Sequence, residues 1–340
     1  MKDIRTTNIL LLIIVIPIVF YLLKTLSFIL IPLVLSMFIA LLFLPLMRWL
    51  RKRKTPKIIS IIIVVLIIIG VLFIAVELIN LSSKEILSSK NIFFNKAEIK
   101  LSALTNYVEN MFGIERPEGQ KAFSYYFQND SLMKNFGSTF SFIGSTISMT
   151  LTTLFFTILW LAESINFQKL LNSTILKQKH SSVKVFMKVE NDLIKFMKVK
   201  FLISLGTGIG IGLACYFFDV SFPIFWGLFA FVINFLQMVG SFISVILLAI
   251  FAFVELDPTS TLFFFILSIT LVQVLFGGIL EPIFMGKSFS INVITILVML
   301  MLWGFIWGIP GLIMSIPITV FVKIILEQYP KTKTIAKLMA

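Results

Sequence analysis

The sequence predicts an all-α, polytopic integral membrane protein with about seven to eight transmembrane helices, some of them broken or re-entrant. Hydrophobic residues make up 59% of the 340 residues, only 13% are charged, and the mean hydropathy is +1.04. The apolar residues form long runs, and the run 260–280 contains no charged residue. A hydrocarbon layer of about 30 Å needs about 20 such residues in a helix, and lipid excludes exposed irregular backbone.

Residues 1–80 are expected to form the first membrane helices. The apolar stretch 9–47 fits two helices with an interruption near Ser27, and 58–80 forms the next crossing. The N-terminus resembles a signal peptide but lacks a small-residue cleavage motif, so we expect a retained helix. The stretch 48–57 carries six basic residues and no acid, which predicts a cytoplasmic loop.

The middle of the chain alternates between the two sides of the membrane in this interpretation. Residues 81–138, whose charges nearly balance, form an extracytoplasmic helical segment, and 139–163 cross back. Residues 164–200 then form cytoplasmic amphipathic helices with apolar residues on one face and lysines on the other. We expect this apolar face to lie on the inner membrane surface.

Residues 201–327 are expected to form a C-terminal transmembrane core, followed by a cytoplasmic tail at 328–340. Two apolar segments, 223–254 and 291–325, are each too long for one straight crossing. Glycine, proline or polar residues interrupt both, so each segment tilts strongly, bends or folds back as a hairpin. Since the basic tail belongs in the cytoplasm, the parity of crossings favours two bent helices or two hairpins.

Polar residues at these interruptions are the candidates for a solute or ion path. Broken membrane helices expose backbone groups and partial dipoles at membrane depth, which is where transporters bind their substrates. Glu281 is a carboxylate at the end of a charge-free helix, and Lys287 is a candidate partner across the following turn. The alternative is that both residues mark the external interface. The path candidates are Glu281, Gln273, Asn234, Gln237, Lys287 and Asn292.

A second group of residues is expected to shape helix breaks and close helix packing. Gly206 and Gly210 form a G-x-x-x-G pair, which lets two membrane helices approach closely. The remaining members are Gly240, Ser241, Pro282, Gly286, Gly308, Pro310, Gly311 and Pro317.

Several classes of function are excluded by composition. A single cysteine, Cys215, and a single histidine, His180, cannot build a disulfide framework or a cysteine–histidine metal site. We expect no metal, no cofactor and no enzymatic activity, because no nucleophile, metal or phosphate-binding constellation is present. The net charge of +13 lies in clusters next to the apolar runs, which indicates contact with an anionic lipid bilayer and not with nucleic acid.

Three motifs stand out in the second half of the chain: EPIFMGKSFSIN (281–292), the Gly308, Gly311 and Pro317 spacing, and Lys200, Ser204 and Gly208 in IKFMKVKFLISLGTG. Together they resemble the motifs of the AI-2E (autoinducer-2 exporter-like) family of bacterial transporters. INFLQMVGSFISVI (233–246) is similar to a further family segment, but Gln237 and Ser241 stand where the family has proline. The resemblance implies a multi-spanning inner-membrane permease that forms a homo-oligomer, for which a pentamer is one candidate.

Three functions are compatible with these observations. The first is export of a small polar solute similar to autoinducer-2, the signalling furanone associated with the family. The second is exchange of a monovalent cation, sodium or lithium, for protons, with Glu281 as the exchanging carboxylate. The third is a non-transporting membrane scaffold or lipid-binding protein that uses 164–200 and 81–138. In each case the protein lies in the bacterial inner membrane with both termini cytoplasmic.

Overall fold

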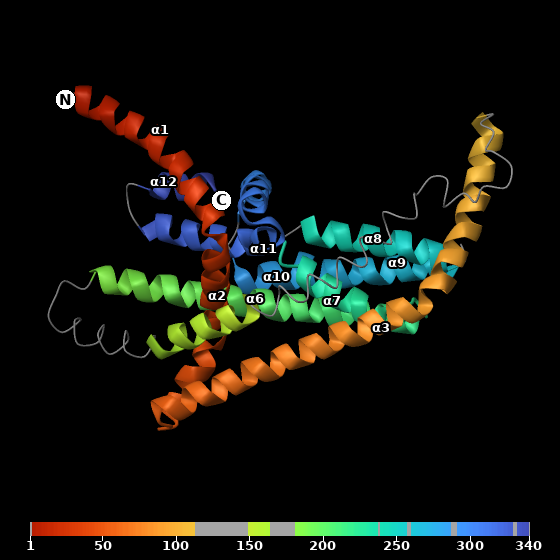
Figure 1. Cartoon of the computed structure of the whole chain (residues 1–340), viewed down its shortest axis with the longest axis horizontal. Coiled ribbons are helices and arrows are strands. Elements are labelled where there is room, and N and C mark those ends of the chain that lie inside the picture. Colours follow the sequence, from red (N-terminus) through yellow and green to blue (C-terminus); the bar gives the residue numbers. More distant parts are fainter. Residues whose placement is uncertain are drawn as a thin grey trace.

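The computed structural model describes residues 2–112, 149–163, 181–236, 239–256, 260–286, 291–328 and 332–339, and every regular element in these ranges is helical (Figure 1). In chain order they are α1 (Lys2–Thr25), α2 (Ser27–Lys52), α3 (Lys57–Phe112), a helix at Met149–Glu163, α6 (Ser181–Phe217), α7 (Pro223–Ile233), α8 (Val239–Glu255), α9 (Ser260–Gln273), the π-helix η1 (Val274–Leu280), α10 (Glu281–Met285), α11 (Val293–Gln328) and α12 (Lys333–Leu338).

The described helices include five that are long and apolar enough to cross a membrane. Four shorter apolar helices accompany them. The all-α class predicted from the sequence is therefore confirmed, whereas the number of seven to eight crossings stays a prediction. The five candidate spans are Ser27–Lys52, Lys57–Ser88, Met187–Phe217, Ser260–Met285 and Val293–Gln328.

The N-terminal helices differ in how much protein surrounds them. α1 projects away from the helices around α6, and α2 runs past them (Figure 1). Most side chains described in α1 are exposed, while α2 buries Phe38, Leu44 and Met47. α3 is a single helix of 56 residues, about 84 Å long. The boundary expected after residue 80 therefore falls inside a continuous helix.

α6 also continues through an expected boundary, at residue 200. The amphipathic pattern in its first half is real, since Val189, Leu193 and Phe196 are buried while Lys188 and Lys195 are exposed. However, this apolar face packs into a protein core with residues of α2 and α11. The expected position on the lipid surface is wrong for this part of α6, because its own chain covers the apolar face. Residues 164–180 lie outside the described ranges.

The segment 223–254 is a hairpin and not a bent helix. Trp226 near the start of α7 and Phe251 near the end of α8 have ring centroids 5.1 Å apart. At the other end of the pair, a Cβ placed on Gly240 would lie only 1.9 Å from the Ile233 carbonyl oxygen. Both ends of the two helices therefore meet, which requires an antiparallel arrangement with its tip between α7 and α8.

α11 folds back in the same way. Gly308 has backbone angles φ 62° and ψ −138° inside the helix, a left-handed conformation that favours glycine. Trp303 and Gly311 approach so closely that a Cβ on Gly311 would lie 2.0 Å from the Trp303 carbonyl oxygen. The short helix α12 then bridges the two ends of α11, because the Thr332 hydroxyl donates to the Leu326 carbonyl (2.8 Å) and the Asn292 amide donates to the Met339 carbonyl (3.0 Å).

Pro317, which the sequence suggested as a further break, lies buried within the second arm of α11, where only Gly308 is non-helical. Proline removes one backbone hydrogen bond but is tolerated in membrane helices whose neighbours compensate. Pro310 occupies the first turn after the Gly308 reversal, the position in a helix where a missing N–H costs least.

Glycines on two faces of α6 hold the core helices together. A Cβ on Gly208 would lie 2.7 Å from the Gly227 carbonyl of α7. On another face, a Cβ on Gly206 would meet the Phe276 ring of η1 at 2.3 Å, and one on Gly210 would meet Val272 of α9 at 2.8 Å. Glycine pairs thus bring α6 against both α7 and the α9–η1 helix.

Candidate functional site

A buried ion pair lies at the centre of the candidate site. Lys200 Nζ of α6 lies 2.8 Å from Glu281 Oε1 of α10, and the two residues are only 1% and 5% exposed. Burial of an ion pair costs desolvation energy that is recovered only with good geometry, and loss of one member leaves an uncompensated charge. The pair keeps the interior neutral while placing two strong hydrogen-bonding groups inside a membrane-spanning region.

The π-helix η1 leads directly into Glu281. It occupies Val274–Leu280, and the Glu281 amide donates to the carbonyl of Phe276, five residues earlier. π-Helices are rare and are frequently found at functional sites. The sequence favours the irregularity here, since Gly277 and Gly278 weaken the helix and Pro282 has no N–H to donate.

The tip of the α7–α8 hairpin reaches the same face of α6 as the ion pair. Asn234, directly after α7, is buried, and its Nδ2 donates to Ser204 Oγ at 3.1 Å. Ser204 lies one helical turn after Lys200. On the other arm, a Cβ on Gly277 of η1 would lie 3.5 Å from Ser241 Oγ, so the tip also adjoins the π-helix.

A second polar pair connects the hairpin to the end of α9. Gln273 Nε2 donates to Ser244 Oγ at 2.7 Å, and both residues are buried. The Oε1 atom of Gln273 has no hydrogen-bond partner among the described residues. A buried acceptor without a donor is costly, so this oxygen is a free hydrogen-bonding group inside the site.

The structure brings together three of the six path candidates. Glu281 and Asn234 meet the same stripe of α6 through Lys200 and Ser204, and Gln273 joins them at the other end of η1. Gln237 and Lys287 lie outside the described residues. Glu281 pairs with Lys200 and is buried, which argues against the alternative that it marks an exposed interface.

Asn292 makes structural contacts at the start of α11. Its Oδ1 accepts from the Thr295 amide at 2.7 Å, which caps the start of α11. Its Nδ2 donates to the Leu338 carbonyl at 2.7 Å and ties α12 to this helix. Gly286 ends α10 with φ 72°, a conformation suited to the glycine at this turn.

Lys200, Ser204 and Ser244 were not proposed as path residues from the sequence. Lys200 lies at the end of the range 164–200, whose lysines the sequence analysis places on the polar face, although a signal for its burial is present. Val189, Leu193 and Phe196 recur at helical spacing, and the same spacing continues to Lys200 and Ser204. A lysine that falls on the apolar face of its helix was therefore a detectable exception.

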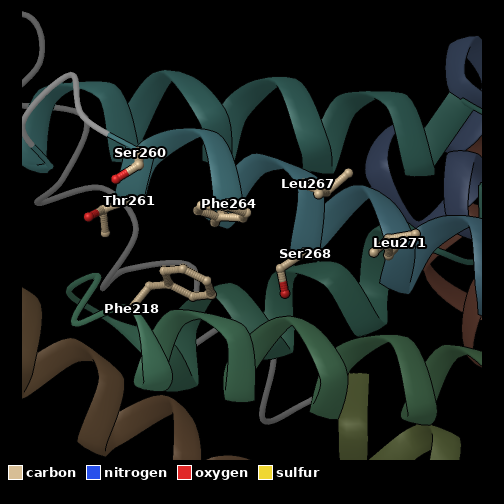
Figure 2. A pocket seen from close by; sticks show the side chains of 7 residues that line it. All are labelled: Phe218, Ser260, Thr261, Phe264, Leu267, Ser268 and Leu271. Atoms are coloured by element: carbon tan, nitrogen blue, oxygen red, sulfur yellow. The ribbon is translucent and has the colours of Figure 1, made fainter.

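A hollow of about 510 Å³ lies elsewhere, between α9 and the end of α6 (Figure 2). Its walls are mainly apolar, and the hydroxyls of Ser260, Thr261 and Ser268 are its polar groups. It contains none of the path candidates. Within the described ranges, no group of three or more His, Cys, Asp or Glu residues is arranged to hold a metal ion.

Comparison with known proteins agrees with this architecture. The profile of the AI-2E family transporters matches residues 9–331. A protein of Haemophilus influenzae, provisionally described as a transport protein, is 26% identical over 321 residues, which are 92% of this chain and 90% of that protein. A similarly described protein of Borreliella burgdorferi is 36% identical over 142 residues, 41% of this chain and 39% of the relative.

The AI-2 transport protein TqsA of Escherichia coli is 25% identical over 325 residues, covering 92% of this chain and 89% of TqsA. The family match, over residues 9–331, includes both hairpins and the positions of Lys200 and Glu281. The family consists of transporters, and the apolar helices of this chain indicate a multi-pass membrane protein. The chain belongs to the AI-2E transporter family.

Proposed function

We propose that this protein exports a small polar solute, similar to autoinducer-2, across the bacterial inner membrane, with both termini in the cytoplasm. The observation that carries the proposal is the Lys200–Glu281 ion pair, 2.8 Å long and buried beside the tip of a re-entrant hairpin. The name of TqsA supports the choice of solute by analogy.

The path would pass between the hairpin tip and the π-helix. Asn234, Ser204, Ser244 and Gln273 provide amide and hydroxyl groups around the ion pair. A solute that enters would exchange its water contacts for these groups, and the free Gln273 Oε1 would accept a hydrogen bond from it. The chain contains no phosphate-binding loop, so transport would use a gradient of the solute or of an ion.

Exchange of sodium or lithium for protons is a second candidate. The observation that favours it is the position of Glu281, a buried carboxylate within the candidate span Ser260–Met285. Carboxylates inside membrane segments often mark ion pathways. In this mechanism a monovalent cation would replace the Lys200 ammonium beside Glu281, and a proton would neutralise the carboxylate in the other half of the cycle.

Everted membrane vesicles from an expressing host and a control host test both candidates. Uptake of labelled furanone into the vesicles measures export, and dissipation of an imposed proton gradient on addition of sodium or lithium measures exchange. The variant is Glu281→Gln, and the matched control is Glu77→Gln, an exposed acid on α3. The amount of each protein in the membrane is measured alongside.

Export predicts furanone uptake that falls at least about tenfold in Glu281→Gln, the factor that about 1.4 kcal/mol of lost stabilisation produces. The control should keep its activity. Cation-dependent loss of the proton gradient without furanone uptake would replace export by exchange. If a folded wild-type protein shows neither activity, the hypothesis of a non-transporting scaffold remains.

A further inference from the structure

We infer that α3 acts as a clasp that positions the α7–α8 hairpin, with Glu85 as a positioning residue for the buried site. The inference rests on the proposed function only in giving the hairpin a role in transport. Its structural part concerns the base of the hairpin, defined here as Ser221, Phe222, Glu255 and Leu256, which lies at the end opposite the tip.

Glu85 contacts the part of this base that precedes α7. Its Oε1 accepts a hydrogen bond from the Phe222 amide at 3.1 Å, across 137 residues of sequence. Phe222 immediately precedes α7 and has φ 65°, a left-handed conformation that is unfavourable for a residue with a bulky side chain. A charge-assisted hydrogen bond is among the stronger ones, so Glu85 stabilises the conformation that starts α7 in its observed direction.

The next turns of α3 contact the part of the base at the end of α8. Lys100 Nζ donates to the Leu256 carbonyl at 2.9 Å. Lys96 Nζ lies 3.9 Å from Glu255 Oε1, and Glu255 also accepts hydrogen bonds from the amide and the hydroxyl of Ser221. Glu255 therefore joins the start of α7 to the end of α8, and both to α3.

An aromatic contact completes the clasp between these polar interactions. The rings of Phe93 on α3 and Phe251 on α8 are stacked, with centroids 4.7 Å apart and planes 9° apart. Phe251 also contacts Trp226 and Phe222 of the opposite arm. Contacts from Glu85 to Lys100 thus grip both arms of the hairpin along about four turns of a single helix.

The position of the base determines the position of the tip. α7 has 11 residues and α8 has 17, and these short helices are rigid rods of about 16 and 25 Å. A rotation of the base is therefore transmitted to Asn234 and Ser241 at the tip. Since the tip borders η1 and the Lys200–Glu281 pair, α3 sets how closely the hairpin approaches the buried site.

The test uses the reactivity of a single cysteine at the tip. Ser241→Cys is introduced in a Cys215→Ala background, and its labelling by a membrane-impermeant maleimide is timed in everted and right-side-out vesicles. The variants added to this background are Glu85→Ala, which removes the acceptor, and Glu85→Gln, which keeps a carbonyl oxygen. Glu77→Ala, on the exposed side of the same helix, is the matched control.

We expect Glu85→Ala to raise the labelling rate about fivefold, and Glu85→Gln and Glu77→Ala to leave it within about twofold, because a free tip samples more open positions. The melting temperature and detergent elution profile of each variant show whether it folds. If Glu85→Ala does not fold, Lys100→Met replaces it, because this change weakens the contact of α3 with the end of α8. An unchanged labelling rate in a folded Glu85→Ala or Lys100→Met protein would overturn the clasp.

Furanone uptake in the native-cysteine background is the second readout. We expect Glu85→Ala to lower the maximal uptake rate about fivefold with a smaller change in half-saturation, and Glu85→Gln to restore it, since the clasp orders the tip without touching the solute. Changed labelling with no uptake in any protein, wild type included, would contradict the proposed export and leave the clasp supported. If Glu85→Ala changes the labelling rate but leaves uptake unaltered, the role of the clasp in transport is refuted.

Discussion

The two helical hairpins have the same backbone design and opposite chemistry at their tips. In α7–α8 and in α11, a glycine lets the two arms approach, at Gly240 and Gly311 respectively. The first tip carries buried Asn234, which reaches Ser204 on α6. The second tip carries Trp303 and Trp307, whose rings are 4.8 Å apart.

The second tip is attached to the N-terminal helices instead of to the ion pair. Trp307 Nε1 donates to the Leu23 carbonyl at 2.9 Å, and Lys24 Nζ lies 4.5 Å from the Phe305 ring centroid. Ser315 and Thr319, in the second arm of α11, are buried, but each donates to a carbonyl of its own helix. The difference teaches that the reversal alone does not make a site; the polar groups that the tip brings to α6 do.

The largest expected effect breaks both hairpins. Gly240→Ala and Gly311→Ala each place a methyl group within about 2 Å of a backbone oxygen, so neither pair of arms can close. We expect each change to lower the free energy of unfolding by more than about 5 kcal/mol. Such a loss would be seen as a failure to obtain monodisperse protein in detergent. A well-folded Gly311→Ala protein with the wild-type melting temperature would refute the α11 hairpin.

The next largest effect comes from breaking the ion pair between α6 and α10. Lys200→Met leaves Glu281 buried without a counter-charge, which costs about 3–5 kcal/mol. The double variant Lys200→Met/Glu281→Gln removes both charges and should recover most of this stability. The measurement is a double-mutant cycle on thermal unfolding in detergent, and additive losses would show that the two side chains do not interact.

The two tips should separate transport from stability. Asn234→Leu is expected to reduce furanone uptake at least about tenfold, with a stability loss of about 1–3 kcal/mol because the Ser204 hydroxyl loses its donor. Trp307→Phe removes one hydrogen bond at the apolar tip and should cost about 1 kcal/mol while leaving uptake unchanged. A Trp307→Phe protein that folds normally and fails to transport would place the α11 tip in the path.

The smallest expected effect is a gain in stability, at a glycine where a methyl group would meet open space. Gly70 lies inside α3, and a Cβ there would meet no atom within 4 Å. Gly70→Ala should therefore stabilise the helix by up to about 1 kcal/mol. A destabilised Gly70→Ala protein would mean that the unoccupied space beside α3 is filled in the membrane, for example by another copy of the chain.

Hydropathy and spacing were sufficient for the class of fold and for the positions of both reversals. Apolar runs of more than 20 residues predict membrane helices because of the cost of exposing backbone to lipid. The sequence could not distinguish bends from hairpins, since glycine and proline permit either. The choice depends on contacts between arms, such as those of Gly240 with Ile233, which exist only in the folded chain.

The candidate site was predicted in part for a similar reason. Glu281, Gln273 and Asn234 are polar residues at interruptions of apolar runs, and local sequence was enough to single them out. The ion-pair partner of Glu281 is 81 residues away, whereas local inspection could only offer Lys287. The role of Lys200 depends on which face of α6 is covered, and α2 and α11 provide that cover.

The central claim is that the Lys200–Glu281 pair takes part in transport and does not only stabilise the fold. The most direct test exchanges the two charges in the double variant Lys200→Glu/Glu281→Lys and compares its thermal unfolding and furanone uptake with those of Glu281→Gln and wild type. The account predicts that the exchange recovers stability relative to Lys200→Glu alone, while uptake stays at least about tenfold below wild type because each charge must face a particular part of the path. Full uptake by the folded exchange variant would contradict it and reduce the ion pair to a structural contact.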